Sequence, residues 1–319
     1  MSDSLLVYIW RDDTAFARKV ASLSPRITTV TRQQLDEDPE LLARLDVVYG
    51  HLQKGELDGA TGLRWLQTTS AGVNGLITPQ LKERDLIVTT TSGIHAEPIT
   101  EQMFGMVLGV TRQLYASWDA QRERKWGIDA NPQGDFTLLA GKTLGLLGVG
   151  AIGSHAAVIG KAFGMKVVGF RRSKGEHPHI ETMYGDDELA EFLSQCDVVM
   201  NSLPLTDDTR GFIGDAEFTV LKPGAIFVNA GRGATVSTDA LLRALEAGQV
   251  GAACLDVTDP EPLPFDHPLW TTPNVYITPH TGGGRPDYTD RADEIFLANL
   301  RCFLDNQQLK NVVDKNAGY

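Results

Sequence analysis

The sequence predicts an α/β protein built from two doubly wound, parallel-sheet domains. The chain has 319 residues, which is about two domains at ~150 residues each. Short apolar runs alternate with helix-like stretches, a pattern typical of parallel strands with helices on both faces of the sheet. One long helical pattern, from Pro98 to Arg124, interrupts the alternation and is interpreted as the bridge between the domains.

The first domain is predicted to contain four strands and one helix before the bridging helix begins. Strands are expected at 5–9, 46–49, 64–68 and 86–90, and the helix at 14–23. Pro98 suits the first turn of the bridging helix, because that position leaves its N–H unpaired and proline has none. Apolar residues then recur at helical spacing, at Met103, Val107, Val110 and Leu114.

The second domain is predicted to contain six strands with helices between them. Strands are expected at 142–147, 166–170, 198–201, 225–229, 252–257 and 275–278, and helices at 151–163, 187–194, 215–220 and 238–247. A last helical pattern, at 290–304, follows after this set is complete. We expect it to return to the first domain, which would then consist of residues 1–98 and 285–319, with 99–284 as the second domain.

The composition excludes several classes of protein. Apolar residues make up 42% and charged residues 22%, which excludes bulk disorder or a fibre. The net charge of −12 disfavours binding to nucleic acid or to an anionic membrane. No apolar run approaches a signal-peptide core or a membrane span of ~20 residues, so we expect a cytoplasmic protein. The three cysteines, Cys196, Cys254 and Cys302, form no metal-binding pattern, and no metal is expected.

A glycine-rich loop, Gly148-Val-Gly-Ala-Ile-Gly153, lies between a predicted strand and a predicted helix. Gly148 permits a tight turn, Gly150 lets the backbone approach a pyrophosphate, and Gly153 lets the helix pack against the strand. Ala151 and Ile152 open the helix, whose first N–H groups would bind the anion. A structural glycine turn and the similar loop of a methyltransferase are the alternatives. The full strand–loop–helix–strand context favours dinucleotide binding.

The end of the second strand of this domain indicates which dinucleotide is bound. An NAD site places a carboxylate there to accept from the ribose 2′-hydroxyl. This chain has Arg171, Arg172 and Ser173 instead. Two guanidinium groups and a hydroxyl suit a 2′-phosphate, so NADP(H) is predicted over NAD(H). The alternative is a pair of solvated surface arginines.

Four further segments are Ser70-Ala-Gly-Val-Asn74, Asn229-Ala-Gly-Arg-Gly233, Leu255-Asp-Val-Thr-Asp-Pro-Glu-Pro262 and Thr278-Pro-His-Thr-Gly-Gly283. With them the chain resembles the D-isomer-specific 2-hydroxyacid dehydrogenases over nearly its whole length, in their NADP-type, glyoxylate/hydroxypyruvate reductase-like branch. The resemblance implies a Rossmann cofactor domain inserted in a flavodoxin-like substrate domain. It also implies a small 2-keto or 2-hydroxy acid as substrate, and a homodimer built through the cofactor domain.

The resemblance also implies roles for single residues. Arg232 matches the arginine that binds the substrate, His280 the general acid/base, and Glu261 the carboxylate that hydrogen-bonds this histidine. Ser70, Ala71, Gly72 and Val73 match the loop that holds the substrate carboxylate. Cofactor contacts are implied at Leu203, Pro204, Thr209, Ala230, Gly231, Arg232, Asp256, His280 and Gly282. The stretch Thr281-Gly-Gly-Gly-Arg285 departs from the more usual small or alanine-rich one, a difference that could change the contacts of this loop with the cofactor.

The predicted chemistry asks for the same residue types. Reduction of a 2-keto acid needs a fixed cation for the carboxylate, and arginine supplies a planar fork. It needs a proton donor that works near neutral pH, for which histidine is suited. Each residue has an ordinary alternative: Arg232 as a surface ion pair, Glu261 as a solvated carboxylate, His280 as a loop histidine. Among the other histidines we single out His95, at the start of the bridging helix. A non-catalytic, dinucleotide-sensing corepressor of the same fold is the alternative function.

Overall fold

The structure is a computed structural model and describes residues 4–73, 75–128 and 136–318. The chain divides into two compact units. Unit 1 combines residues 1–94 with 286–319, and unit 2 comprises residues 95–285. The boundaries expected from the sequence, 98/99 and 284/285, differ from this division by a few residues.

Unit 1 contains a five-stranded parallel sheet in the order β2-β1-β3-β4-β5, which is the flavodoxin-like order. The sequence-based prediction omitted one of its strands, an edge strand of four residues whose central pair is Thr-Thr. Two threonines between two apolar residues give too short an alternation for the pattern to be recognised. The strands are β1 (Leu5–Ile9), β2 (Ile27–Val30), β3 (Val47–Tyr49), β4 (Trp65–Gln67) and β5 (Ile87–Thr89).

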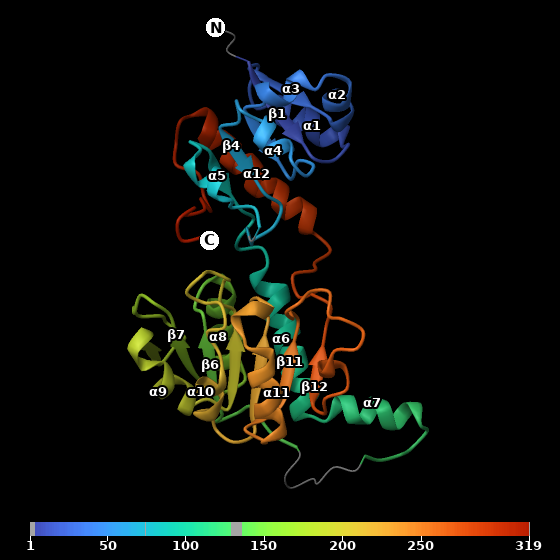
Figure 1. Cartoon of the computed structure of the whole chain (residues 1–319), viewed down its shortest axis with the longest axis vertical. Coiled ribbons are helices and arrows are strands. Elements are labelled where there is room, and N and C mark those ends of the chain that lie inside the picture. The colour runs from blue at the N-terminus through green and yellow to red at the C-terminus, as the bar shows by residue number, and fades with distance from the viewer. Residues whose placement is uncertain (1–3, 74, 129–135, 319) are drawn as a thin grey trace. The chain divides into compact units, whose positions relative to one another are not determined.

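The last helix of the chain, α12 (Tyr288–Leu304), packs in the core of unit 1 (Figure 1). Phe296 of this helix is fully buried, and its ring stacks on Tyr49 with 4.2 Å between centroids. The return of the C-terminal segment to the first domain is therefore seen in the packing of the unit. The other helices of unit 1 are α1 (Thr14–Ala21), α2 (Arg32–Glu37), α3 (Glu40–Arg44), α4 (Glu56–Gly59) and α5 (Pro79–Glu83).

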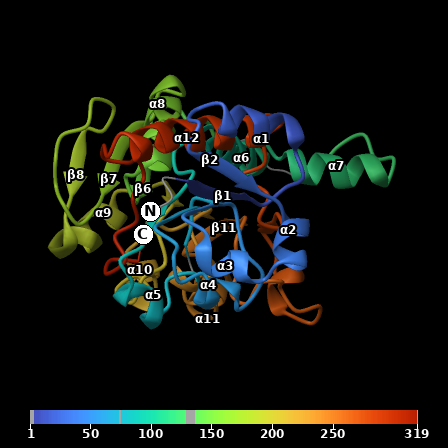
Figure 2. The ribbon, with the colours of Figure 1, turned by 90° about the horizontal axis from the view of Figure 1, so that it is seen from above.

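Unit 2 contains a seven-stranded parallel sheet in the order β12-β11-β10-β9-β6-β7-β8, an extended Rossmann order. Figure 2 shows β6, β7 and β8 in sequence toward the outer edge of this sheet. The prediction of six strands was wrong by one, because β8 has only three residues. The strands are β6 (Thr143–Leu147), β7 (Lys166–Phe170), β8 (Thr182–Tyr184), β9 (Val198–Asn201), β10 (Ala225–Asn229), β11 (Val250–Leu255) and β12 (Val275–Ile277).

The predicted bridging helix is two helices, α6 (Ala96–Thr111) and α7 (Leu114–Arg122). Gln113 separates them with a left-handed backbone (φ 55°), which no α-helix can continue through. Phe104 of α6 stacks on Phe163 at the end of α8, so α6 packs within unit 2. The remaining α-helices of the unit are α8 (Ala151–Ala162), α9 (Leu189–Ser194), α10 (Asp215–Thr219) and α11 (Thr238–Glu246).

The predicted fold class, two doubly wound α/β units with parallel sheets, is confirmed. Apolar clusters cover both faces of the unit 2 sheet, so its central strands β9 and β10 are buried along their length, whereas the edge strands β8 and β12 are partly exposed. The topological switch point of this sheet lies between β6 and β9, whose helices leave on opposite faces. Among the described helices, none combines the length and apolar character needed to cross a membrane.

Candidate functional site

The glycine loop lies at the switch point of unit 2, between β6 and α8. Gly148 has a left-handed backbone (φ 94°), and a Cβ on Gly153 would lie 2.2 Å from the carbonyl oxygen of Gly148. Gly150 differs from both, since no described atom lies within 4 Å of where its Cβ would be. Gly150 is also the N-cap of α8 and supplies no side-chain cap. The first N–H groups of this helix, including those of Ala151 and Ile152, therefore face an open space that a phosphate could fill.

The two arginines after β7 have different surroundings. Arg172 donates from Nη2 to Oδ2 of Asp208 at 2.9 Å, and both side chains are exposed. Arg171 is more enclosed, and its Nε is buried with no hydrogen-bond partner among the described residues. A buried guanidinium nitrogen without an acceptor is costly, so Arg171 is the better candidate to meet an added anion. Ser173 is exposed beside them.

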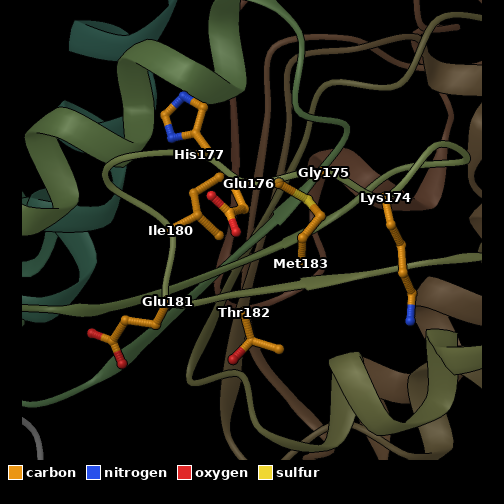
Figure 3. A pocket seen from close by; sticks show the side chains of 8 residues that line it. All are labelled: Lys174, Gly175, Glu176, His177, Ile180, Glu181, Thr182 and Met183. Atoms are coloured by element: carbon orange, nitrogen blue, oxygen red, sulfur yellow. The ribbon is translucent and has the colours of Figure 1, made fainter.

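A groove of about 660 Å³ lies beyond these arginines, between the β7–β8 connection and β8 (Figure 3). Lys174 and His177 stand on opposite sides of it, and Lys174 is paired with Glu188. The pKa of His177 is lowered by burial and by the nearby His179 and Arg171. None of the residues that the sequence singled out for the site lines this groove. The full lining is Lys174, Gly175, Glu176, His177, Ile180, Glu181, Thr182 and Met183.

Two buried asparagines connect the ends of β9 and β10. The Nδ2 of Asn201 donates to Oδ1 of Asn229 at 3.1 Å and to Oγ1 of Thr235 at 2.8 Å. Asn201 Oδ1 accepts from the backbone N–H of Leu203, and Thr235 Oγ1 donates to the carbonyl of Arg232. One network therefore holds both the loop of Leu203 and the loop of Arg232. Sequence reasoning missed these asparagines, although polar residues that end two buried strands were a usable signal.

The loop between Leu203 and Thr209 is closed by its own hydrogen bonds. Thr209 donates from Oγ1 to the carbonyl oxygen of Pro204 at 2.6 Å. A Cβ on Gly231 would lie 2.6 Å from the carbonyl oxygen of Leu203, so this loop packs directly against the backbone beside Arg232. Ala230 is buried at the same place. The residues that the family resemblance assigned to the cofactor in these two loops therefore lie close together in space.

Arg232 follows β10 at the carboxyl edge of the sheet. Its Nη1 donates to the carbonyl of Gly231 at 2.7 Å. Burial lowers the pKa of Arg232, and the negative charge of Glu261 acts in the opposite direction. The guanidinium is thus held in a partly desolvated place, where its attraction for a carboxylate is stronger than in water.

His280 and Glu261 are joined by a hydrogen bond of 2.9 Å between Nδ1 and Oε2. Glu261 is held in turn, since its Oε1 accepts from the backbone N–H of Thr258 at 3.0 Å. His280 has a left-handed backbone (φ 52°), which is uncommon for a residue other than glycine. Its N–H donates to the carbonyl oxygen of Asp256 at 2.8 Å. The structure therefore brings His280 and Glu261 into contact and places Glu261 near Arg232.

Asp256 is buried beneath this loop, and both of its carboxylate oxygens accept hydrogen bonds. Gly282 donates its N–H to Oδ2 at 2.9 Å, and a Cβ on Gly282 would approach the same oxygen to 2.7 Å. Gln102, on α6, donates to Oδ1 at 2.6 Å. Asp256 and Gly282 are thus adjacent, and their contacts are with the protein itself. Gln102 is a further residue that the sequence gave no reason to single out.

His95 lies at the N-cap of α6, within unit 2. Burial lowers the pKa of His95, and the positive charges of Arg285 and Arg232 lower it further. Its Cδ2 lies 3.1 Å from where a Cβ on Gly283 would be, so the ring packs against the loop that follows His280. His95 therefore favours the neutral form beside the candidate site.

The loop of residues 70–73 belongs to unit 1. Its backbone is anchored by the N–H of Thr91, which donates to the carbonyl of Ser70 at 3.1 Å. The N–H groups of Ala71, Gly72 and Val73 donate to no acceptor within the described part of the chain. These three N–H groups are therefore available to an anion. Asn74, the last residue of the motif, lies outside the described residues.

The cysteines take no part in these arrangements. Cys196 and Cys254 are fully buried, and burial raises the pKa of each thiol to about 12. Within the residues that the structure places, no group of three His, Cys, Asp or Glu side chains could hold a metal ion.

Comparison with known proteins identifies the family. Residues 104–282 match the family model described as "D-isomer specific 2-hydroxyacid dehydrogenase, NAD binding domain". The chain belongs to the D-isomer specific 2-hydroxyacid dehydrogenase family. The matched range contains the glycine loop, Arg232, Glu261 and His280, whereas the loop of residues 70–73 lies outside it.

Individual relatives agree with this assignment. A glyoxylate reductase from Aeropyrum pernix is 34% identical over 263 residues, which cover 81% of this chain and 78% of that protein. A crystal structure of a D-isomer specific 2-hydroxyacid dehydrogenase family protein from Aeromonas salmonicida is 34% identical with a TM-score of 0.85, and covers 98% and 100% of the two chains. An NADPH-dependent glyoxylate/hydroxypyruvate reductase from Sinorhizobium meliloti, solved with NADP and sulfate, is 26% identical with a TM-score of 0.83, covering 99% and 100%.

Proposed function

We propose that the chain reduces small 2-keto acids to D-2-hydroxy acids, with NADPH as the preferred hydride source and NADH as the weaker alternative. The observation that carries this proposal is the hydrogen bond between His280 and Glu261, with Glu261 also near the half-buried Arg232. The family membership and the glyoxylate reductases among the relatives support the same reaction class.

The proposed roles follow from the positions of the side chains. Arg232 binds the carboxylate and the keto oxygen through its planar fork. Glu261 occupies Nδ1 of His280 and so fixes the ring, which leaves Nε2 to give its proton to the keto oxygen. Addition of one hydride to the carbon and one proton to the oxygen converts the keto group into a hydroxyl group. The free N–H groups of Ala71, Gly72 and Val73 support a further contact to the substrate carboxylate.

The residues of unit 2 fit a nicotinamide dinucleotide. The open space at Gly150 and the uncapped start of α8 suit the pyrophosphate. When bound, the nicotinamide supplies the hydride. Leu203, Pro204 and Thr209 would border the adenosine, and Ala230 and Gly231 would lie toward the other half of the dinucleotide.

The preference for NADPH is proposed from the end of β7. Arg171 offers a buried Nε that lacks an acceptor among the described residues, as a 2′-phosphate would require. Arg172 already donates one hydrogen bond to Asp208, whose negative charge would oppose a nearby phosphate, so its contribution is proposed to be smaller. Relatives solved with NADP or NADPH support this preference. A homodimer remains part of the proposal, to be tested by light scattering.

A panel of keto acids tests the function. Glyoxylate, hydroxypyruvate, pyruvate, and branched and aromatic keto acids would each be supplied with NADPH or NADH, and loss of the reduced cofactor followed. We expect turnover of at least one small keto acid, a D-configured product and a higher kcat/KM with NADPH. Tight NADPH binding without turnover of any keto acid would favour the dinucleotide-sensing alternative and overturn the proposed enzyme.

A further inference from the structure

The carboxylate of Asp256 accepts three hydrogen bonds from the loop that carries His280. Its Oδ1 accepts from Thr278 Oγ1 at 2.6 Å and from the N–H of Thr281 at 3.0 Å, while Oδ2 accepts from the N–H of Gly282 at 2.9 Å. These donors lie on both sides of His280 in the sequence. Together with the bond from His280 N–H to its carbonyl oxygen, Asp256 holds the histidine loop through four contacts of its own.

Gln102 is the side chain that reaches this carboxylate from another helix. Its Nε2 donates to Asp256 Oδ1 at 2.6 Å and to Thr278 Oγ1 at 2.7 Å. A primary amide has two N–H bonds, so both contacts can be made at once. Thr278 in turn donates its hydroxyl hydrogen to Asp256, which closes a triangle of three side chains. Every donor in the triangle has an acceptor.

The triangle matters because the backbone of His280 is not in a relaxed conformation. A left-handed φ of 52° costs free energy for a residue with a Cβ, and it persists only where the surroundings hold it. Asp256 can provide that hold only while its position is fixed. Gln102 fixes this position from α6, because it donates one hydrogen bond to Asp256 and one to Thr278.

We propose that Gln102 is a positioning residue which, through Asp256 and Thr278, holds the His280 loop in its proton-donating arrangement. This inference rests on the proposed reductase function. In this arrangement the carboxylate of Asp256 accepts four hydrogen bonds from protein groups, three at Oδ1 and one at Oδ2, and so organises the loop. Gln102 need not touch the substrate for this role.

Two substitutions of Gln102 distinguish the loss of its hydrogen bonds from electrostatic repulsion against Asp256. Gln102→Met keeps the length of the side chain and removes both hydrogen bonds. Gln102→Glu keeps the shape and places a second carboxylate against Asp256, which is the more severe change. The matched control is Glu101→Gln, on the neighbouring, exposed position of the same helix. All three variants would be compared with the full-length wild-type protein.

Hydrogen exchange gives a readout that does not depend on turnover. We expect the backbone amides of Thr281 and Gly282 to exchange faster in Gln102→Met and fastest in Gln102→Glu, with Glu101→Gln unchanged. In the keto-acid assay we expect kcat to fall about tenfold or more in Gln102→Met, since small misplacements of a catalytic group are costly. The KM for NADPH should change little, because the glycine loop is untouched.

The outcomes distinguish the two proposals. If wild-type protein turns over no keto acid, the proposed function fails, and the exchange data alone then decide whether Gln102 holds the loop. If wild-type protein is active and Gln102→Met leaves both kcat and the exchange of Thr281 and Gly282 unchanged, the inference is overturned. The inference is also overturned if Gln102→Met lowers kcat and the melting temperature but leaves the exchange of Thr281 and Gly282 unchanged, because that pattern indicates only a general structural role.

Discussion

Arg11 donates two parallel hydrogen bonds to Asp293, from Nη1 to Oδ1 at 2.8 Å and from Nη2 to Oδ2 at 2.6 Å. Residues 282 positions apart in the chain are joined in this way inside unit 1. The hydroxyl of Tyr49 donates to the same carboxylate at 2.8 Å. The contact links the segment that follows β1 to helix α12, and both side chains are largely buried.

Asp293→Asn should destabilise unit 1 by about 3 kcal/mol, because it leaves the enclosed Arg11 guanidinium with only the more exposed and more distant carboxylate of Asp13. Urea unfolding followed by tryptophan fluorescence would measure the change. Asp119→Asn breaks an exposed ion pair with Arg122 and is the matched control, with little change expected. Equal midpoints for the two variants would contradict this account of Asp293.

His280→Ala should remove keto-acid reduction while leaving dinucleotide binding intact, because only the proton donor is lost. Glu261→Gln should keep the ring in place by a hydrogen bond but lose the negative charge, and we expect kcat to fall about 10²-fold. Turnover is measured with saturating NADPH, and binding by fluorescence of the reduced cofactor. Undiminished turnover in His280→Ala would remove the proposed mechanism.

Arg171→Ala should raise the KM for NADPH by about tenfold or more and leave the KM for NADH nearly unchanged, since one charge-assisted hydrogen bond of about 1.5–3 kcal/mol is lost. Arg172→Ala should have the smaller effect, because Asp208 already occupies that guanidinium. The ratio of kcat/KM for the two cofactors measures the preference. An unchanged ratio in both variants would refute the assignment of NADPH.

Gly150→Ala and Gly153→Ala should fail in different ways. A methyl group at Gly150 enters open space, so the variant should fold normally but bind the dinucleotide weakly, with KM raised about tenfold or more. A methyl group at Gly153 would meet the backbone of Gly148, so that variant should lose thermal stability. Melting temperature and cofactor KM, measured for both, test the pair. Normal cofactor binding by Gly150→Ala would argue against the pyrophosphate position.

His95 makes stability depend on pH in a defined direction. Its pKa in the folded chain is lowered from the ordinary value of 6.5, mainly by burial. The unfolded chain therefore takes up the proton first as pH falls below 6.5, so folding stability decreases with falling pH. His95→Gln should lack this contribution and show a flatter profile of melting temperature between about pH 7 and pH 5. Parallel profiles for the two proteins would contradict the burial of a neutral His95.

Much of the fold could be predicted because the apolar patterns are strong where both faces of a sheet are covered. The strands Leu5–Ile9, Lys166–Phe170 and Ala225–Asn229 have the residues expected for them. Short edge strands carry a weaker pattern, which is why β2 and β8 were missed. The break at Gln113 could not be seen either, because nothing in its side chain requires a left-handed backbone.

The candidate site could likewise be predicted from the sequence only in part. The glycine loop was predicted from its strand–loop–helix context, and the roles of Arg232, Glu261 and His280 from the resemblance to the family, whose chemistry needs these residue types. Asn201, Asn229 and Gln102 act by supporting those residues, and an amide in a sequence carries no sign of which backbone groups it will meet. Their roles depend on contacts between segments far apart in the chain, such as the 154 positions that separate Gln102 from Asp256.

The paired amides of Asn201 and Asn229 imply that coenzyme choice and keto-acid selectivity are coupled in this protein. The loop of Leu203, proposed to border the adenosine, and the loop of Arg232, proposed to bind the keto acid, are both held by these two buried asparagines. An engineer who alters Asn201 to retune coenzyme choice should find that keto-acid selectivity drifts as well. Independent redesign of the two specificities would have to begin from residues outside that shared support.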